Sequence, residues 1–125
     1  MNKMLELSSC EYSSQYYEDV LWSMDKEITS LSIEVDRGVH FEHLRQVLKE
    51  FKLTCLTLNQ NYADPSTTMD DFLLFIKELQ LNYFILEDFQ TPFLLQLKME
   101  DLIKVAKKDS TIEITYDQCK TTYRF

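Results

Sequence analysis

Residues 53–61 read LTCLTLNQN, and apolar side chains fill four of the first six positions. Such a run, followed by polar residues from Asn59 to Pro65, predicts a strand over Leu53–Leu58 that ends in a loop. Comparable strand centres recur along the chain at intervals of 25, 28 and 28 residues. These centres are Leu31, Leu56, Phe84 and Ile112. Each interval is long enough to hold a helix, so the spacing indicates alternating strands and helices.

Apolar residues at helical spacing predict helices in these intervals. Residues 41–51 form the clearest amphipathic pattern. A further helix is expected over 69–79, because Thr67 and Asp70 at its start are spaced as a capping box. A first helix is expected over 11–29, because Ser8 and Glu11 have the same capping spacing, and a fourth over 99–106.

The remaining strands differ in how their polar residues are arranged. Leu31–Val35 and Thr111–Tyr116 alternate apolar and polar residues, so we expect half-exposed strands near the edges of the sheet. Tyr83–Leu86 does not alternate, which is typical of a central strand covered on both faces. The tail from Thr121 to Phe125 is expected to return as a hairpin.

The sequence therefore predicts an α/β fold: a single compact domain over residues 1–125, with about four helices and four to six strands alternating along the chain. An alternative rests on Leu53–Asn61, which resembles the L-x-x-L-x-L-x-x-N strand motif of leucine-rich repeats. The resemblance implies a short βα solenoid, whose strands pair strictly in sequence order.

Composition excludes several classes of function. The chain of 125 residues has a formal net charge of −8, which disfavours direct binding to nucleic acid or to anionic membranes. One glycine is too few for a Gly-rich phosphate loop, so we expect no nucleotide cofactor. No segment approaches the roughly eighteen apolar residues that cross a bilayer, and no signal-peptide pattern is present. The expected location is the cytoplasm.

Residues that could support catalysis or metal binding are scarce. His40 and His43 are the only histidines, and no third ligand has a spacing that would complete a metal site with them. The three cysteines, Cys10, Cys55 and Cys119, are odd in number and widely spaced. We therefore expect free thiols in a reducing compartment. We therefore expect neither a metal nor a cofactor, and no enzymatic activity. An enzyme would need these histidines or a pair of carboxylates brought together by folding.

The acidic residues are concentrated in two segments, 11–36 with a net charge of −6 and 59–91 with −5. Tyrosines lie among them, and tyrosine beside carboxylates is typical of a surface that binds arginine and lysine. The predicted partner-binding residues are Tyr12, Tyr16, Glu18, Asp19, Asp25, Tyr62, Asp64, Asp70 and Asp71.

The expected function is non-catalytic. An acidic protein of this size could bind and mask a basic surface of a partner, as immunity proteins do when they neutralise a cognate toxin such as a nuclease. The alternative is an adaptor or scaffold protein with a repeat-like βα architecture, which would use a concave face for binding.

Overall fold

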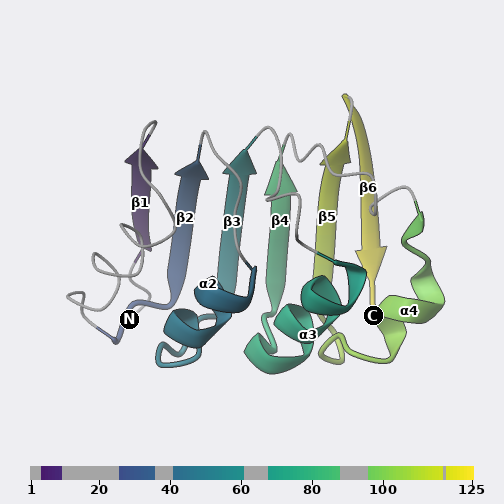
Figure 1. Cartoon of the computed structure of the whole chain (residues 1–125), viewed down its shortest axis with the longest axis horizontal. Coiled ribbons are helices and arrows are strands. Elements are labelled where there is room, and N and C mark those ends of the chain that lie inside the picture. The colour runs from purple at the N-terminus through teal and green to yellow at the C-terminus, as the bar shows by residue number, and fades with distance from the viewer. Residues whose placement is uncertain (1–3, 10–25, 36–40, 61–67, 88–95, 117) are drawn as a thin grey trace.

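A computed structural model describes residues 4–9, 26–35, 41–60, 68–87, 96–116 and 118–125 (Figure 1). In chain order, the elements are β1 (Met4–Ser9), β2 (Ser30–Val35), α2 (Phe41–Leu48), β3 (Cys55–Gln60), α3 (Met69–Leu79), β4 (Tyr83–Glu87), α4 (Met99–Ile103), β5 (Thr111–Tyr116) and β6 (Cys119–Arg124). The fold is α/β, as the sequence predicts.

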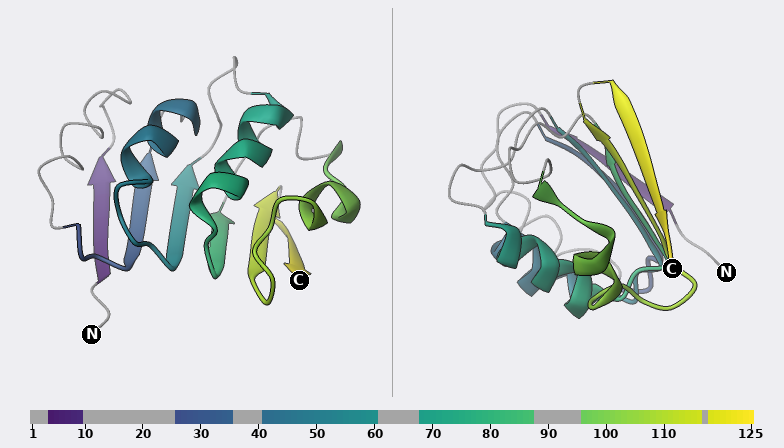
Figure 2. Two further views of the ribbon diagram at one scale, coloured as in Figure 1. Left: turned by 90° about the horizontal axis from the view of Figure 1, so that it is seen from below. Right: turned by 90° about the vertical axis from the view of Figure 1, so that its right-hand side faces the viewer.

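All six strands form one sheet in the order β1-β2-β3-β4-β5-β6, which is also their order along the chain. Each strand from β1 to β5 pairs with the next in parallel, and β6 returns antiparallel to β5. The helices α2, α3 and α4 all lie on the same side of this sheet (Figure 2).

The core fills the space between the sheet and these helices. Two rows of side chains cross the sheet in register, one joining Leu31, Leu56, Phe84 and Ile112 and the other joining Ile33, Leu58, Leu86 and Ile114. Every member of the two rows is at most 5% exposed. Phe41 from α2 and Phe75 from α3 pack above them with ring centroids 5.0 Å apart, and Phe75 also lies 5.5 Å from Phe84.

The loops before the strands repeat as well. Ile28, Leu53 and Leu81 are buried, and each precedes the first core residue of its strand by three positions. The backbone N–H of Cys55 donates to the carbonyl of Thr29 at 3.2 Å, and that of Tyr83 donates to the carbonyl of Thr54 at 3.0 Å. The N–H of Thr111 makes the equivalent bond to the carbonyl of Asn82 at 2.9 Å. Successive βα units are thus stacked in similar positions.

One edge of the sheet differs from the prediction. β2 and β5 lie near the edges as expected, and β6 lies outside β5 as the expected hairpin strand, but β1, which was not predicted, lies outside β2. The six-residue strand β1 was missed because Ser8 and Glu11 have the spacing of a capping box, whereas Ser8 lies in β1 opposite Glu34. Of the helix expected over 11–29, residues 10–25 lie outside the described residues, and Lys26–Thr29 are not helical.

Other boundaries also differ from the prediction. Strand β3 continues through Asn59 and Gln60, because both residues are paired with β2. Helix α4 ends at Ile103, short of the expected Ala106. The carbonyl of Val105 there accepts a hydrogen bond from the Gln80 side chain at 3.0 Å, which ties this turn to the end of α3. The described residues hold three helices, whereas about four were expected for the whole chain.

The expected hairpin at the end of the chain is present. It is tighter than predicted, because Tyr116 pairs directly with Cys119. Gln118, in the turn, has φ 65°, a left-handed conformation. The turn expected at Arg37-Gly38 lies outside the described residues.

Candidate functional site

The face of the sheet opposite the helices is covered by no described helix (Figure 2). We call it the open face and define it by the side chains of β2 to β6 that alternate with the core rows. By strand register its members are Ser30, Ser32, Glu34, Cys55, Thr57, Asn59, Tyr83, Ile85, Glu87, Thr111, Glu113, Thr115, Lys120, Thr122 and Arg124. The prediction that β4 is covered on both faces is therefore wrong for the described part of the chain.

The open face is arranged as rows, because the strands pair without a shift. One row joins Ser30, Cys55, Tyr83, Thr111 and Arg124. The next joins Ser32, Thr57, Ile85, Glu113 and Thr122. The side chains in the middle of the face are half-buried, and the exposed ones are Glu87, Lys120 and Arg124.

Small hydroxyl residues are frequent on this face. Its acidic residues are Glu34, Glu87 and Glu113, and its basic residues are Lys120 and Arg124, so charges of both signs are present. The exposed positions on α3, by contrast, are mainly charged, as at Asp70, Lys77 and Glu78. The two sides of the described molecule therefore differ in surface chemistry.

A hydrogen-bonded network crosses the open face from β4 to β6. The Tyr83 hydroxyl donates to Glu113 Oε1 at 2.5 Å, and Lys120 Nζ lies 3.4 Å from Glu113 Oε2. The Glu113 side chain is only 15% exposed, so this carboxylate depends on these partners. On the adjacent row, Asn59 Nδ2 donates to Glu87 Oε2 at 3.3 Å.

These contacts shift the pKa values of the central pair. The hydrogen bond from Tyr83 lowers the pKa of Glu113, and the charge of Lys120 acts in the same direction, against the opposing effect of burial. The same hydrogen bond raises the pKa of Tyr83, and burial adds to the increase. At neutral pH, an ionised Glu113 therefore accepts from a protonated Tyr83.

Cys55 lies on the open face, opposite Tyr83 in the strand register, although it stands within an apolar run of the sequence. Its side chain is half-buried, and the thiol is free. Burial raises the pKa of this thiol, although a hydrogen bond with Ser30 opposes the increase. The thiol form predominates at neutral pH, which does not favour a nucleophilic role.

Seven of the nine predicted partner-binding residues lie outside the described residues: Tyr12, Tyr16, Glu18, Asp19, Asp25, Tyr62 and Asp64. The other two, Asp70 and Asp71, lie in the first turn of α3. Asp71 forms part of a capping box, because its N–H donates to Thr68 Oγ1 at 3.2 Å while its carboxylate accepts from the Thr68 N–H at 3.4 Å.

The predicted capping pair is wrong by one residue. The sequence TTMDD offers Thr67 with Asp70 and Thr68 with Asp71 at the same spacing. The second pair is used, and Met69 is the first residue of the helix. Phe72, Phe75 and Ile76 of this helix are buried in the core.

The open face was not predicted as a site. Its signal is the alternation of polar with apolar residues in β2 and β5, which by itself predicts only half-exposed strands. Tyr83 is 30 residues from Glu113 in the sequence, so only the strand register brings it to the Glu113–Lys120 pair of the hairpin.

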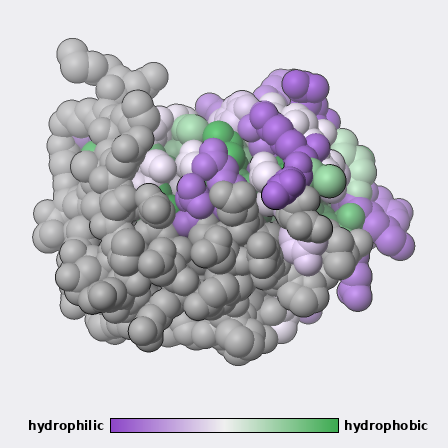
Figure 3. Space-filling model, turned by 90° about the horizontal axis from the view of Figure 1, so that it is seen from above, coloured by the Kyte–Doolittle hydropathy of each residue, from purple (hydrophilic) through white to green (hydrophobic). Residues whose placement is uncertain are grey.

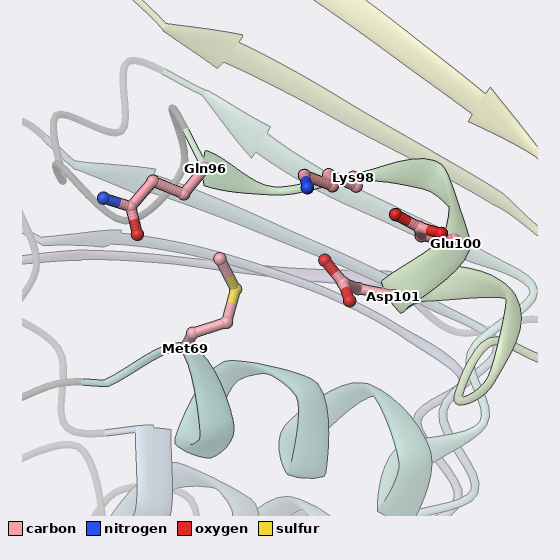
Figure 4. Close-up of a pocket in the computed structure, with 5 residues that line it drawn as sticks. All are labelled: Met69, Gln96, Lys98, Glu100 and Asp101. Carbon is pink, nitrogen blue, oxygen red and sulfur yellow. The ribbon is translucent and has the colours of Figure 1, made fainter.

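A depression lies between the starts of α3 and α4 (Figure 4). Its lining residues are Met69, Gln96, Lys98, Glu100 and Asp101, and its volume is about 520 Å³. Among the described residues, no three His, Cys, Asp or Glu side chains are grouped so that they could hold a metal ion. His40 lies outside the described residues, and His43 is part of α2.

The described surface shows no continuous apolar patch in the view from above, where hydrophilic and hydrophobic residues are mixed (Figure 3). The described helices include none that is long and apolar enough to cross a membrane. Comparison of the chain with protein-family models, curated proteins and solved structures finds no match.

Proposed function

We propose that this chain is a non-catalytic protein-binding module with a repeat-like βα architecture, and that it binds its partner through the open face. The observation that carries this proposal is the strand order, together with helices on a single side of the sheet. Parallel sheets usually have both faces covered. Leucine-rich-repeat solenoids are an exception, because they pair strands in sequence order and use the uncovered face for binding.

The repeated positions of the core support the same architecture. The spacing of Leu53, Leu56 and Leu58, which resembles the strand motif of leucine-rich repeats, recurs at Ile28, Leu31 and Ile33 and at Leu81, Phe84 and Leu86. All nine side chains are buried. We propose that the chain is a short leucine-rich-repeat-like solenoid forming one domain.

The composition of the open face fits a protein interface. The centre of a typical interface is depleted of charged residues and is surrounded by a polar rim. The middle of the open face is formed by residues such as Thr57, Tyr83 and Ile85, and the exposed charges lie at Glu87, Lys120 and Arg124. A partner could cover the middle without burying an unpaired charge.

A pair of substitutions tests this function. Thr57→Arg places a long charged side chain in the middle of the open face, and Gln46→Arg places the same side chain at an exposed position of α2. A protein captured from extracts of the source cells by the wild-type chain should be lost with Thr57→Arg and retained with Gln46→Arg. Equal capture by both folded variants would exclude the open face as the interface.

A second candidate function is the masking of a basic partner in the cytoplasm, such as a toxin or nuclease domain, as immunity proteins do. The specific support is the distribution of charge. Residues 10–25 hold four acidic and no basic side chains, and this segment begins at the carboxyl end of β1. A concentration of acidic residues accelerates association with a basic surface.

Charge reversal distinguishes a local acidic surface from net charge alone. Glu18, Asp19 and Asp25 are changed together to Lys, and the matched control changes Glu42, Glu50 and Glu100, which are exposed on the helix side. Both variants alter the net charge equally. Slower association of the first variant alone with a captured basic protein supports masking, and equal rates for the two variants contradict it.

A further inference from the structure

We infer that Tyr83 is the anchor of the interface, meaning the side chain that contributes most to binding, and that Glu113 positions it. The partner that we infer is a protein of net positive charge. This inference rests on the proposed function, because it assumes that the open face binds a protein. It adds which side chain dominates binding, how that side chain is held, and which kind of partner the chain fits.

Tyr83 has a central position on the open face. Strand β4 has β3 on one side and β5 on the other, and Tyr83 pairs in register with Cys55 and Thr111. Tyr83 is the one aromatic residue among the described members of the open face, and its neighbours within its row are small. Ile85 lies two residues further along the same strand and adds apolar surface. Tyrosines at the centre of an interface are frequent hot spots of binding energy.

The network around Tyr83 holds its side chain before a partner binds. The hydroxyl donates to Glu113 Oε1 at 2.5 Å, and Glu113 Oε2 lies 3.4 Å from Lys120 Nζ. Glu113 is mostly buried and its side chain is fixed on both oxygens. A ring that is already oriented loses less conformational freedom on binding, and this strengthens the interaction.

Charge complementarity indicates which kind of partner binds the open face. The chain carries a formal net charge of −8, so a basic protein is attracted and a second copy is repelled. The open face of β2 to β6 carries Glu34, Glu87 and Glu113 against Lys120 and Arg124, so it adds no positive charge that would repel a basic partner. We therefore expect a partner that is basic overall and places an apolar or aromatic surface against Tyr83 and Ile85.

The test uses linear peptides selected from a displayed random library on the immobilised wild-type chain. We expect the selected peptides to contain more Arg and Lys than Asp and Glu. Their affinity should fall about tenfold or more with Tyr83→Ala, since that is the loss typical of a hot spot, and less with Tyr83→Phe, which keeps the ring. Lys52→Ala, at an exposed position of the loop between α2 and β3, should leave the affinity unchanged.

The positioning role of Glu113 needs a readout that a loss of fold would not mimic. In Glu113→Gln, the peptides should bind several-fold more weakly, and the Tyr83 phenol should ionise at lower pH than in the wild-type chain. Phenolate absorbance measures this ionisation, and circular dichroism monitors the fold. Unchanged ionisation or unchanged affinity would overturn the positioning role.

The outcomes separate this inference from the proposed function. If Thr57→Arg abolishes peptide binding and Tyr83→Ala does not, Tyr83 is not the anchor, but the open face is still the interface. If neither substitution affects binding, both the anchor role of Tyr83 and the proposed interface are contradicted. Selected peptides that are acidic, or self-association of the chain in sedimentation, would contradict the basic partner.

Discussion

At the scale of single residues, the pair of Tyr83 and Glu113 makes a pH-dependent contribution to stability. The pKa of Glu113 in the folded chain lies below its ordinary value. At a pH above the ordinary pKa, the ionised carboxylate therefore stabilises the fold in full, and this stabilisation is lost as the pH falls through the folded-state pKa. We expect Glu113→Gln to lower the free energy of unfolding by about 1–2 kcal/mol at pH 7, because a hydrogen bond to a charged group is lost. The difference from the wild-type chain should shrink below about pH 4. Urea denaturation at several pH values measures it.

The opposite shift of Tyr83 provides an independent check at high pH. Its folded-state pKa lies above the ordinary value, so its contribution is complete below that value and is lost as the pH rises through the folded pKa. In Tyr83→Phe, this alkaline component of the stability curve should therefore be absent. Lys120→Met is the control, because the Lys120 side chain is 59% exposed and its ion pair contributes about 1 kcal/mol at most.

For the prediction at acid pH, the contradicting outcome concerns Glu113→Gln. If the loss of stability at acid pH is the same in this variant as in the wild-type chain, other carboxylates account for it.

The two described cysteines should differ in reactivity toward iodoacetamide. Burial raises the pKa of Cys55, which reduces its thiolate fraction, whereas Cys119 is exposed at the start of β6. We expect alkylation of Cys119 to be faster at pH 7, as followed by mass spectrometry of the digested protein. Because Cys55 pairs with Tyr83 across the strands, a bound partner should slow its alkylation further. Faster reaction of Cys55 than of Cys119 would contradict the half-buried position.

At the scale of elements, the start of α3 offers a direct comparison between two adjacent threonines. Thr68 forms the capping box with Asp71, so Thr68→Ala should lower the free energy of unfolding by about 1 kcal/mol. Thr67→Ala is the matched control and should cost less, although the sequence pattern favoured Thr67 as the cap. Thermal or urea denaturation measures both. A larger cost for Thr67→Ala would place the helix start one residue earlier.

Most elements could be predicted because their apolar residues repeat at regular spacing. The periods of α2, α3 and β5 are clear in the sequence, and each forms close to its expected place. Element ends were harder, since they depend on tertiary contacts such as that of Gln80 with Val105. The site could not be predicted, because Tyr83 and Glu113 become neighbours only through strand pairing.

At the scale of the whole molecule, repetition explains both the regular core and the one-sided arrangement. Each βα unit places its strand beside the preceding one, so successive units bury a common core that no unit could bury alone. The rows from Leu31 to Ile112 and from Ile33 to Ile114 continue through four strands. Such a stack has an exposed edge at each end, and the sheet must be protected there from pairing with other chains.

Strand β6 protects the edge at β5, and its removal should change the oligomeric state. β6 pairs with every residue of β5 from Thr111 to Tyr116, and it carries Lys120 and Arg124, charges of the kind that discourage edge pairing. A chain truncated after Tyr116 exposes the backbone of β5, whose sequence TIEITY has high β-propensity. We expect its average mass in sedimentation velocity to rise with concentration more steeply than that of the full chain.

A control must separate the effect of a less stable fold from the effect of exposing the edge of β5. Leu58→Ala removes a fully buried side chain from β3 and should cost about 2–5 kcal/mol, but it leaves β5 paired with β6. This variant should therefore associate no more than the wild-type chain under conditions where it is folded. If the truncated chain folds cooperatively and keeps the mass of the full chain, β6 is not needed to protect the edge. The contacts of Tyr123 and Phe125 with the core would then be its main contribution.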